Sequence, residues 1–325
     1  MRTNLSSQIS LNRVSPKYYK PENAVERSVL TRCEKVPTDI YETMEEGVQH
    51  IANEITAKIQ ERQREGKFCV IGAGTGASLR PLYAELVRKH KDEGLSFRNV
   101  VIFNLYEYYP LASEGAGSSF SQLNDLFLSH IEYCRLYEQR IQTFGGIDIV
   151  LMGIGREGNI AMNEPGSSLS SPTRLILIDS TSRAEAAHNL GVDNLPPCSI
   201  TMGVATIMTA RKIYLLAWGD DKADIIKKAV EDKVSDTLPA SYLQMHNNAN
   251  VCIDLAAASH LTRIQRPWLV TNCEWNDKLI RSAIVWLCMR VKKPILKLTN
   301  KDYNENGLSE LLALYGSAYN VNIKI

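Results

Sequence analysis

The sequence FCVIGAGTGAS at residues 68–78 decides the fold. It begins with the apolar run Phe68–Ile71, passes through a glycine-rich turn and leads into a helical pattern near residues 78–91. Strand, turn and helix in this order form the unit from which parallel sheets are built. The backbone N–H groups of such a turn can surround a phosphate, and the hydroxyls of Thr75 and Ser78 add donors. We therefore expect a parallel sheet with an anion-binding loop at the end of one strand.

The same turn also fits a dinucleotide-binding pattern. Gly72, Gly74 and Ala77 satisfy G-x-G-x-x-G/A, which expects an acidic residue about 20 positions later, at the end of the next strand. Here that distance falls at residues 91–93, Lys-Asp-Glu, inside or just after the predicted helix. Nicotinamide-nucleotide binding and a purely structural glycine turn stay open as alternatives, and phosphate binding is the interpretation that we favour.

Alternating strand and helix patterns extend from this unit in both directions. Each predicted strand is continuously apolar, which is typical of a parallel sheet covered on both faces. We predict an α/β, three-layer, Rossmann-like fold: a mostly parallel sheet with helices on both faces and its ligand at the carboxyl ends of the strands. The predicted helices are Asp39–Arg64, Ser78–Lys91 and others within Ser118–Phe144, and the predicted strands are Phe68–Ile71, Val100–Phe103 and Ile147–Met152.

Three parts are expected along the chain. Residues 1–37 are polar and interrupted by prolines, which indicates an amino-terminal arm; residues 38–258 form the main domain. Residues 259–325 are predicted to be a carboxyl-terminal α/β extension that ends on a strand, so we expect the chain to lead into a further domain of a longer protein. The extension's predicted strands are Trp268–Thr271, Ile295–Leu298 and Val321–Ile325, and its predicted helices are Trp275–Arg290 and Asn306–Tyr315.

The composition excludes several classes of function. The chain has 325 residues, of which 44% are hydrophobic and 22% charged, and 37 Lys and Arg balance 36 Asp and Glu. A formal net charge of +1 gives no global basic field, so we expect neither nucleic acid nor a membrane as partner. The seven scattered cysteines form no metal-ligand spacing, which predicts reduced thiols, no metal site and a cytoplasmic location.

Two further loops carry a family resemblance. They are FNLYEY at residues 103–108 and GIGREGNIAMNEPGSS at residues 153–168. Together with the glycine turn they resemble the glucosamine-6-phosphate deaminase/isomerase family, within the wider group of sugar-phosphate isomerases and lactonases. The resemblance runs from about Glu42 to Asp254, and the triplet Asn-Glu-Pro at residues 163–165 separates it from the phosphogluconolactonases.

The resemblance implies a site for the phosphate of a sugar. The matching residues are the loop Thr75, Gly76, Ala77 and Ser78, with Ser167, Arg174 and Lys222. Arginine offers a planar fork to phosphate oxygens and lysine a point charge. Ala77 stands where glycine is usual and Ser78 where threonine is usual. Ile176 and His188 replace two cationic positions of the family, so we expect a reduced phosphate affinity.

The positions that the resemblance implies for catalysis depart further from the family. An aspartate moves a proton between C1 and C2 of the opened sugar in the family, and Tyr106 stands at its position; a phenol with a pKa near 10 is a poor base at neutral pH. Ring opening uses an Asp, His and Glu, matched here by Glu157, Asn159 and Glu164. Asn159 removes the one group of that set that titrates near neutral pH. Glu107 is carboxylic, but we expect it to point away from the side on which Tyr106 lies.

The sequence therefore supports two hypotheses of different kinds. The first is a deaminase/isomerase that acts on an amino-sugar phosphate without any cofactor, with weakened catalytic residues. The alternative is a catalytically degraded domain that binds a sugar phosphate and has a regulatory or scaffolding role in a longer protein. We expect a homo-oligomer in either case. A connection usual in the family is nearly absent between His130 and Glu132, which indicates either a true deletion or a segment missing from this sequence.

Overall fold

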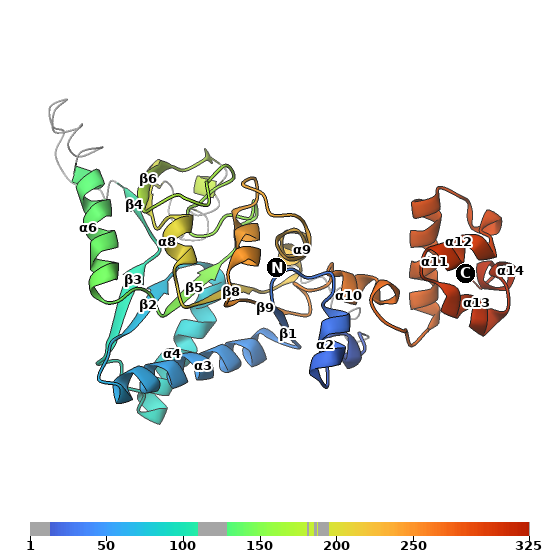
Figure 1. Cartoon of the computed structure of the whole chain (residues 1–325), viewed down its shortest axis with the longest axis horizontal. Helices are drawn as coiled ribbons and strands as arrows, with labels where there is room; N and C mark the ends of the chain where they lie inside the picture. The colour runs from blue at the N-terminus through green and yellow to red at the C-terminus, as the bar shows by residue number, and fades with distance from the viewer. Residues whose placement is uncertain (1–13, 110–128, 181, 185–186, 188–194, 325) are drawn as a thin grey trace. The chain divides into compact units, whose positions relative to one another are not determined.

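The structure is a computed structural model, and it describes residues 14–109, 129–180, 182–184, 187 and 195–324. The chain forms two compact units (Figure 1). The larger unit is Glu34–Ala258, and the smaller one consists of Met1–Cys33 together with Ser259–Ile325. Each unit has a hydrophobic core of its own.

A six-stranded parallel sheet forms the centre of the larger unit. Its order is β1-β9-β8-β5-β2-β3, and every neighbouring pair runs parallel. Because all six strands point the same way, their carboxyl ends share one edge of the sheet. The strands are β1 (Thr38–Tyr41), β2 (Cys69–Ala73), β3 (Val100–Asn104), β5 (Ile149–Gly153), β8 (Lys212–Ala217) and β9 (Ala249–Asp254).

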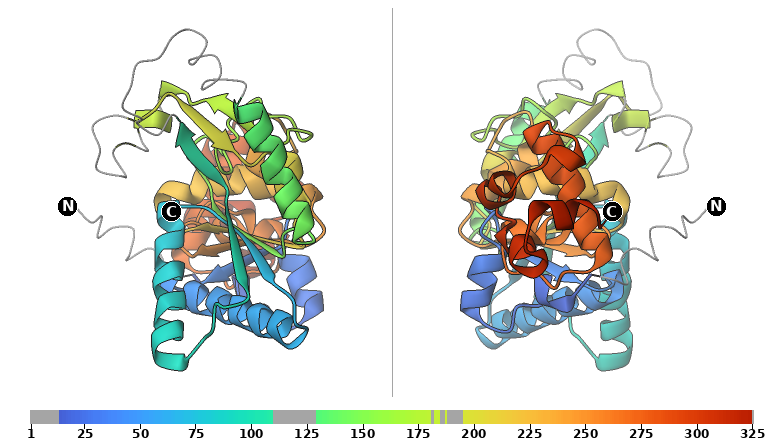
Figure 2. Two further views of the ribbon diagram at one scale, coloured as in Figure 1. Left: turned by 90° about the vertical axis from the view of Figure 1, so that its left-hand side faces the viewer. Right: turned by 90° about the vertical axis from the view of Figure 1, so that its right-hand side faces the viewer.

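Helices cover both faces of this sheet, which confirms the predicted three-layer α/β fold. Figures 1 and 2 show α3 (Met44–Arg64) and α4 (Arg80–Glu93) on one face, with α6 (Ser129–Thr143), α8 (Val204–Met208) and α9 (Ala223–Glu231) on the other. The core beneath α3 and α4 contains fully buried isoleucines at helical spacing, which pack on the apolar side chains of the strands. These isoleucines are Ile51, Ile55 and Ile59.

A second sheet of three antiparallel strands continues from the end of β3. Its order is β4-β7-β6, with β4 at Tyr106–Tyr109, β6 at Arg174–Leu177 and β7 at Cys198–Thr201. Tyr106 of β4 and Arg174 of β6 both pair with Thr201 of β7. The Thr201 hydroxyl also accepts a hydrogen bond from the backbone N–H of Met162 at 3.2 Å. This sheet, which the sequence pattern did not predict, thus links the loop after β3 to the loop after β5.

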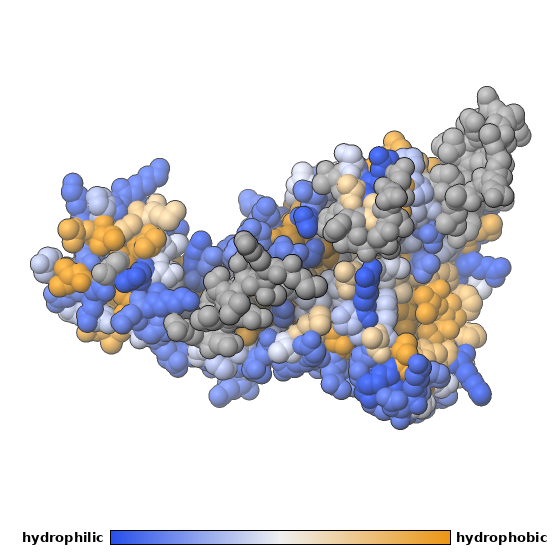
Figure 3. Space-filling model, turned by 180° about the vertical axis from the view of Figure 1, so that it is seen from behind, coloured by the Kyte–Doolittle hydropathy of each residue, from blue (hydrophilic) through white to orange (hydrophobic). Residues whose placement is uncertain are grey.

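The edge strand β3 leaves apolar side chains exposed. Ile102 on this strand is 62% exposed, and Phe68, directly before the neighbouring strand β2, is 52% exposed. Figure 3 shows hydrophobic side chains gathered at this side of the larger unit, on the right of the view. Exposed apolar sheet edges are common places for chains to associate. The oligomeric state itself stays a prediction.

The predicted helix from Asp39 to Arg64 is wrong in its first turn. The segment Thr38–Tyr41 is strand β1, in which Ile40 pairs with Ile253 of β9. Helix α3 begins only after Thr43, whose side chain caps it by accepting a hydrogen bond from the backbone N–H of Glu46. Ile40 matched the helical spacing by coincidence. The part of the predicted helical region 118–144 that precedes residue 129 lies outside the described residues.

The predicted α/β character of the carboxyl-terminal extension is wrong, because the described part of Ser259–Ile325 contains helices and turns and no strand. The predicted strands at 268–271 and 295–298 overlap the short 3-10 turns η6 (Pro267–Leu269) and η7 (Ile295–Lys297), and the predicted last strand at 321–325 overlaps the end of α14 (Ala318–Asn322). The remaining elements of the smaller unit are η1 (Pro16–Tyr18), α2 (Ala24–Leu30), α10 (Thr262–Gln265), α11 (Asp277–Val291), α12 (Asn300–Glu305) and α13 (Ser309–Tyr315).

Local sequence explains this correction. Pro267 and Pro294 each precede or begin a 3-10 turn, and Ser317 caps α14 by accepting a hydrogen bond from the backbone N–H of Asn320. Short apolar runs do not distinguish a strand from a buried helical turn. Val321, the first residue of the predicted strand, is fully buried in a helical core with Leu287, Tyr303 and other side chains.

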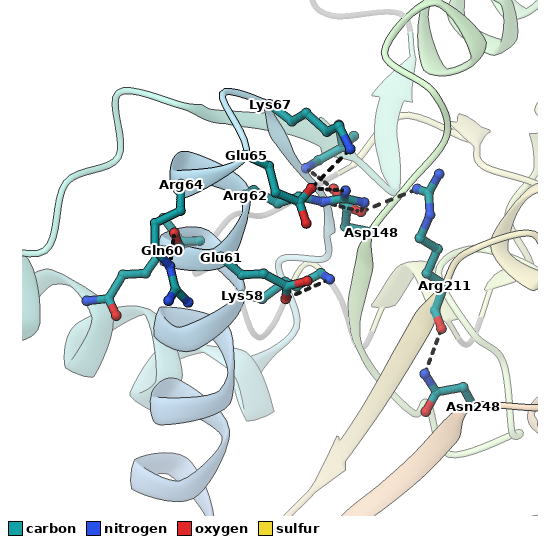
Figure 4. Close-up of polar contacts among 12 residues, drawn as sticks. Lys58, Gln60, Glu61, Arg62, Arg64, Glu65, Lys67, Asp148, Arg211 and Asn248 are labelled. Carbon is teal, nitrogen blue, oxygen red and sulfur yellow. Dashed lines mark hydrogen bonds and ion pairs between the residues drawn. The ribbon is translucent and has the colours of Figure 1, made fainter.

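A buried ion-pair network fixes the amino end of the sheet, opposite the loops that follow the strands. Asp148 is 2% exposed and accepts hydrogen bonds from the guanidinium groups of Arg62 on α3 and Arg211 before β8 (Figure 4). Its second oxygen accepts from the backbone N–H of Val70 at 2.9 Å. The carboxylate of Asp148 raises the pKa of the Arg62 guanidinium, chiefly through their hydrogen bond. One carboxylate therefore ties together α3, β2 and β5.

Gly203, just before α8, provides a test of the packing. A Cβ atom at this residue would lie 2.0 Å from the carbonyl oxygen of Ser171 and 2.1 Å from that of Pro172. Because both are backbone atoms, no side-chain rearrangement relieves the overlap. We expect Gly203→Ala to lower the free energy of unfolding by about 3 kcal/mol, at the upper end of the usual cost of overpacking. Urea unfolding measures it, with Gly76→Ala as the matched control because that position has open space; equal stabilities of the two variants would contradict the described packing.

Candidate functional site

A pocket lies at the carboxyl ends of β2, β3 and β5. Its volume is about 240 Å³, which suits a small metabolite. It brings together seven of the eleven predicted site residues, namely Thr75, Gly76, Ala77, Ser78, Tyr106, Asn159 and Lys222. The other described residues that line it are Gly74, Arg80, Leu105, Tyr108, Met152, Gly153, Ile154, Gly155, Ala161, Met162 and Ser182.

The glycine loop forms one wall of this pocket. It leaves β2 and enters α4 through a short 3-10 turn, η2 (Ala77–Leu79). The Tyr83 hydroxyl donates to the carbonyl oxygen of Gly74 at 2.5 Å, and the Trp218 indole N–H donates to that of Ser78 at 2.9 Å. The loop is thus fixed at both ends. The dinucleotide alternative loses its support, since the next strand, β3, ends at Asn104 rather than at an acidic residue.

Lys222 reaches the pocket from the loop that follows β8. It ends the 3-10 turn η4 (Asp220–Lys222), which starts after Gly219. Gly219 has a φ of +91°, and its backbone N–H donates to both carboxylate oxygens of Asp254 at 3.1 and 3.2 Å. Burial raises the pKa of Asp254. Trp218 and Asp254 therefore hold the Lys222 turn beside the glycine loop.

Tyr106 lines the pocket, and its environment opposes a role as a base. Its hydroxyl lies 2.7 Å from the Thr75 Oγ1, so the two form a hydrogen bond. Burial raises the pKa of Tyr106, and burial also raises that of the neighbouring Tyr108 to about 12. Both phenols are therefore protonated at neutral pH. Glu107, between them on β4, does not line the pocket, in agreement with the alternation expected along a strand.

The loop that follows β5, at residues 153–168, contributes the side-chain amide of Asn159 and no carboxylate to the pocket. Asn159 lines the pocket, and its Nδ2 donates to the carbonyl oxygen of Ala161 at 3.4 Å. Glu157 is exposed and does not line the pocket. Glu164 also lies outside it, where its two carboxylate oxygens accept from the backbone N–H of Asp179 at 3.3 and 3.2 Å. Burial raises the pKa of Glu164. Among the described lining residues there is no Asp, Glu or His.

Ser167 and Arg174, predicted to bind phosphate, lie close to each other but do not line the pocket. Arg174 donates to the Ser167 hydroxyl at 3.0 Å and to the Asn163 side-chain oxygen at 2.8 Å. Burial lowers the pKa of the Arg174 guanidinium. Ile176 lies two residues further along β6, and His188 is outside the described residues. In this structure the guanidinium of Arg174 thus stabilises the chain around Asn163 and Ser167 through hydrogen bonds.

Of the eleven described lining residues that were not among the predicted site residues, three have polar side chains: Arg80, Tyr108 and Ser182. A signal existed for Arg80, because it comes two positions after the predicted phosphate loop and begins the following helix. Tyr108 could have been found from the alternation along β4, since it shares a side with Tyr106. Nothing in the local sequence around Ser182 indicated its position.

Metal-binding clusters, membrane-spanning helices and disulfides are absent among the described residues. No cluster of three or more His, Cys, Asp or Glu residues there is arranged to hold a metal ion. None of the helices in that part of the chain has the length and apolarity needed to span a membrane. The structure forms no disulfide among the cysteines that it describes.

Sequence comparisons agree on one group of proteins. Residues 42–252 match the family model described as glucosamine-6-phosphate isomerases/6-phosphogluconolactonase. A glucosamine-6-phosphate deaminase-like protein of Bacteroides thetaiotaomicron is 64% identical over 346 aligned positions, which cover 100% of this chain and 52% of that protein. This chain therefore spans about half the length of that relative. Glucosamine-6-phosphate deaminase 1 of Bacillus subtilis is 36% identical, covering 66% of this chain and 95% of that protein.

Solved structures give the same result. A protein described as a monomeric glucosamine-6-phosphate deaminase is 34% identical with a TM-score of 0.60, covering 69% of this chain and 99% of that one. A 6-phosphogluconolactonase from Trypanosoma brucei, at 18% identity and a TM-score of 0.53, shares the fold. The 346 positions aligned with the Bacteroides relative exceed the 325 residues of this chain, so that relative has additional residues within the aligned span. Both interpretations of the short connection near residues 130–132, a deletion and a missing segment, stay predictions.

Proposed function

Since the chain belongs to the family of glucosamine-6-phosphate isomerases and 6-phosphogluconolactonases, we propose that its pocket binds an amino-sugar phosphate such as glucosamine-6-phosphate and converts it only slowly. The observation that carries this proposal is the composition of the pocket. Hydroxyl groups, backbone N–H groups and two cationic side chains line it, whereas none of its described lining residues is a carboxylate or an imidazole.

The lining suits a phosphate ester. Thr75 and Ser78 offer hydroxyls, the glycine loop precedes the amino end of α4, and Lys222 supplies a positive charge. Lys222 is 15% exposed and lies 3.9 Å from the nearest carboxylate oxygen, of Asp221. At that distance the ion pair is loose, so the ammonium can contact a bound anion. Tyr106 and Tyr108 then offer ring edges and hydroxyls to the sugar.

The same lining opposes efficient isomerisation. Moving a proton between C1 and C2 requires a group that is unprotonated at neutral pH and lies within hydrogen-bond reach of the sugar. Tyr106 stands at the position of the family's base, and its pKa is raised above 10 by burial. Less than about one phenol in a thousand is then ionised at pH 7. Asn159, in the place of the histidine, cannot exchange a proton near neutral pH.

The competing function is that of a fully active deaminase, which the names of the relatives favour. It would require a base that none of the described lining residues provides. In a longer protein, such as the Bacteroides relative, a domain that binds the sugar phosphate and turns it over slowly would have a regulatory or scaffolding role. Turnover and binding, measured separately, distinguish the two functions.

We expect glucosamine-6-phosphate to bind the protein in calorimetric titration while turnover stays below about 10⁻³ s⁻¹. This rate is about 10⁴-fold below a typical kcat of about 10 s⁻¹, because a base and its proton-transfer partner are each worth about 10²–10⁴. Ammonia and fructose-6-phosphate are followed in the same sample. Turnover at several per second would contradict slow catalysis, and a titration without heat or thermal stabilisation would contradict binding.

A further inference from the structure

We propose that Arg80 is the guanidinium that binds the phosphate group in this pocket, in the place of the cationic residues that the family uses. This inference rests on the proposed function, because it assigns the anion-binding group of the same pocket. Arg80 lines the pocket together with Thr75, Ser78 and Lys222. It is the first residue of α4, directly after the 3-10 turn that ends the glycine loop.

The positive charges of the pocket single out this residue. Of the described residues that line it, only Arg80 and Lys222 are cationic. Arg174, the arginine predicted from the resemblance, donates instead to Asn163 and Ser167 and does not line the pocket. Ile176 replaces another cationic position with an apolar side chain. Among the described lining residues, a phosphate dianion in this pocket therefore meets one guanidinium, that of Arg80.

The location of Arg80 is itself informative. A positive charge in the first turn of a helix opposes the helix dipole, which favours anions at that end. Helix α4 is 14 residues long and has no acidic residue in its first turn, and its N-cap residue, Leu79, makes no side-chain cap. A bound phosphate would be favoured by both groups, because the helix end and the guanidinium would both face a negative charge.

This assignment also orients the ligand. With its phosphate between the glycine loop and Arg80, the sugar extends toward Tyr106, Asn159 and Met162, which line the remainder of the pocket. The guanidinium fork binds two phosphate oxygens at once, whereas an ammonium binds as a point charge. Arginine and lysine at residue 80 are therefore not equivalent.

The test is a calorimetric titration of the whole chain and of Arg80→Met, Arg80→Lys and Arg98→Met with glucosamine-6-phosphate and, separately, with inorganic phosphate. Losing a charge-assisted hydrogen-bond donor weakens binding by about 10- to 100-fold. We expect this loss for both ligands in Arg80→Met and a smaller loss in Arg80→Lys. Arg98 is exposed, does not line the pocket and follows α4, so Arg98→Met is the matched control and should bind like the unsubstituted chain.

The outcomes separate the two proposals. If the unsubstituted chain binds and Arg80→Met binds within about twofold of it, the assignment of Arg80 is overturned while the proposed function stands. If the unsubstituted chain does not bind glucosamine-6-phosphate, the proposed function fails first. Unchanged melting of the unliganded Arg80→Met protein shows that its loss of affinity does not come from unfolding. A loss in Arg80→Met accompanied by equal binding of Arg80→Lys would assign a simple charge rather than a fork and would overturn the bidentate contact.

Discussion

The double variant Tyr106→Asp, Asn159→His should isomerise and deaminate glucosamine-6-phosphate about 10²- to 10⁴-fold faster than the unsubstituted chain. Residues 106 and 159 both line the pocket, so the two substitutions add a carboxylate and an imidazole to the wall that faces a bound substrate. A base that is ionised at neutral pH contributes about this factor to a proton transfer. The measurement is the initial rate of fructose-6-phosphate formation at saturating substrate.

Two control variants test whether the faster rate depends on the position of the new carboxylate. Tyr106→Asn removes the phenol without adding a base, and Tyr108→Asp adds a carboxylate elsewhere in the same pocket. Both should stay as slow as the unsubstituted chain. The double variant should also show a rate that levels off below neutral pH, where its aspartate is ionised. Turnover that depended on Tyr106 itself would keep rising through pH 10, since the pKa of that phenol is raised. Equal rates in the double variant and in Tyr108→Asp would refute the assigned position.

The largest effect on stability is expected for Asp148→Ala, which should lower the free energy of unfolding by about 3–5 kcal/mol. Asp148 is 2% exposed and has both Arg62 and Arg211 as partners, and it also accepts the backbone N–H of Val70 (Figure 4). Its removal leaves the Arg62 guanidinium, whose side chain is 14% exposed, without its buried partner. Urea unfolding monitored by circular dichroism measures the loss.

Glu65→Ala provides the matched control for this network. Glu65 accepts from the same Arg62 at 3.1 Å, but its side chain is 38% exposed and also pairs with Lys67. Surface pairs of this kind contribute about 0–1 kcal/mol. If Asp148→Ala cost no more than Glu65→Ala, the network would not hold α3 against the sheet in the way described.

The sequence pattern predicted the central sheet correctly because each of its strands carries its own signal. Val70 and Ile71 of β2, and Val150 and Leu151 of β5, are buried members of continuous apolar runs, and a glycine-rich turn follows β2. Such runs, separated by helical spacing, are typical of a parallel sheet. In the smaller unit the same kind of short apolar run is helical. Only the capping residues and the surrounding core distinguish the two cases, as Val321 shows.

The candidate site was predicted where one loop supplies several neighbouring groups, as residues 75–78 do. The prediction failed where the pairing of strands far apart in the sequence decides the direction of a side chain. Arg174 lies on β6, whose pairing with β7 at Thr201 brings it close to Ser167 and Asn163 instead of the pocket. Glu164 is fixed by the backbone N–H of Asp179, 15 residues away. Neither the small antiparallel sheet nor these contacts leave a local signal in the sequence.

We propose that the pocket binds a sugar phosphate but does not exchange its C2 proton, because none of the described lining residues is a carboxylate or an imidazole. One nuclear magnetic resonance experiment in deuterated buffer at neutral pH tests both parts. We expect the phosphorus resonance of glucosamine-6-phosphate to broaden when the protein is added, while the C2 proton stays unexchanged and no fructose-6-phosphate forms. An unchanged phosphorus resonance, or rapid deuterium exchange at C2, would contradict the account.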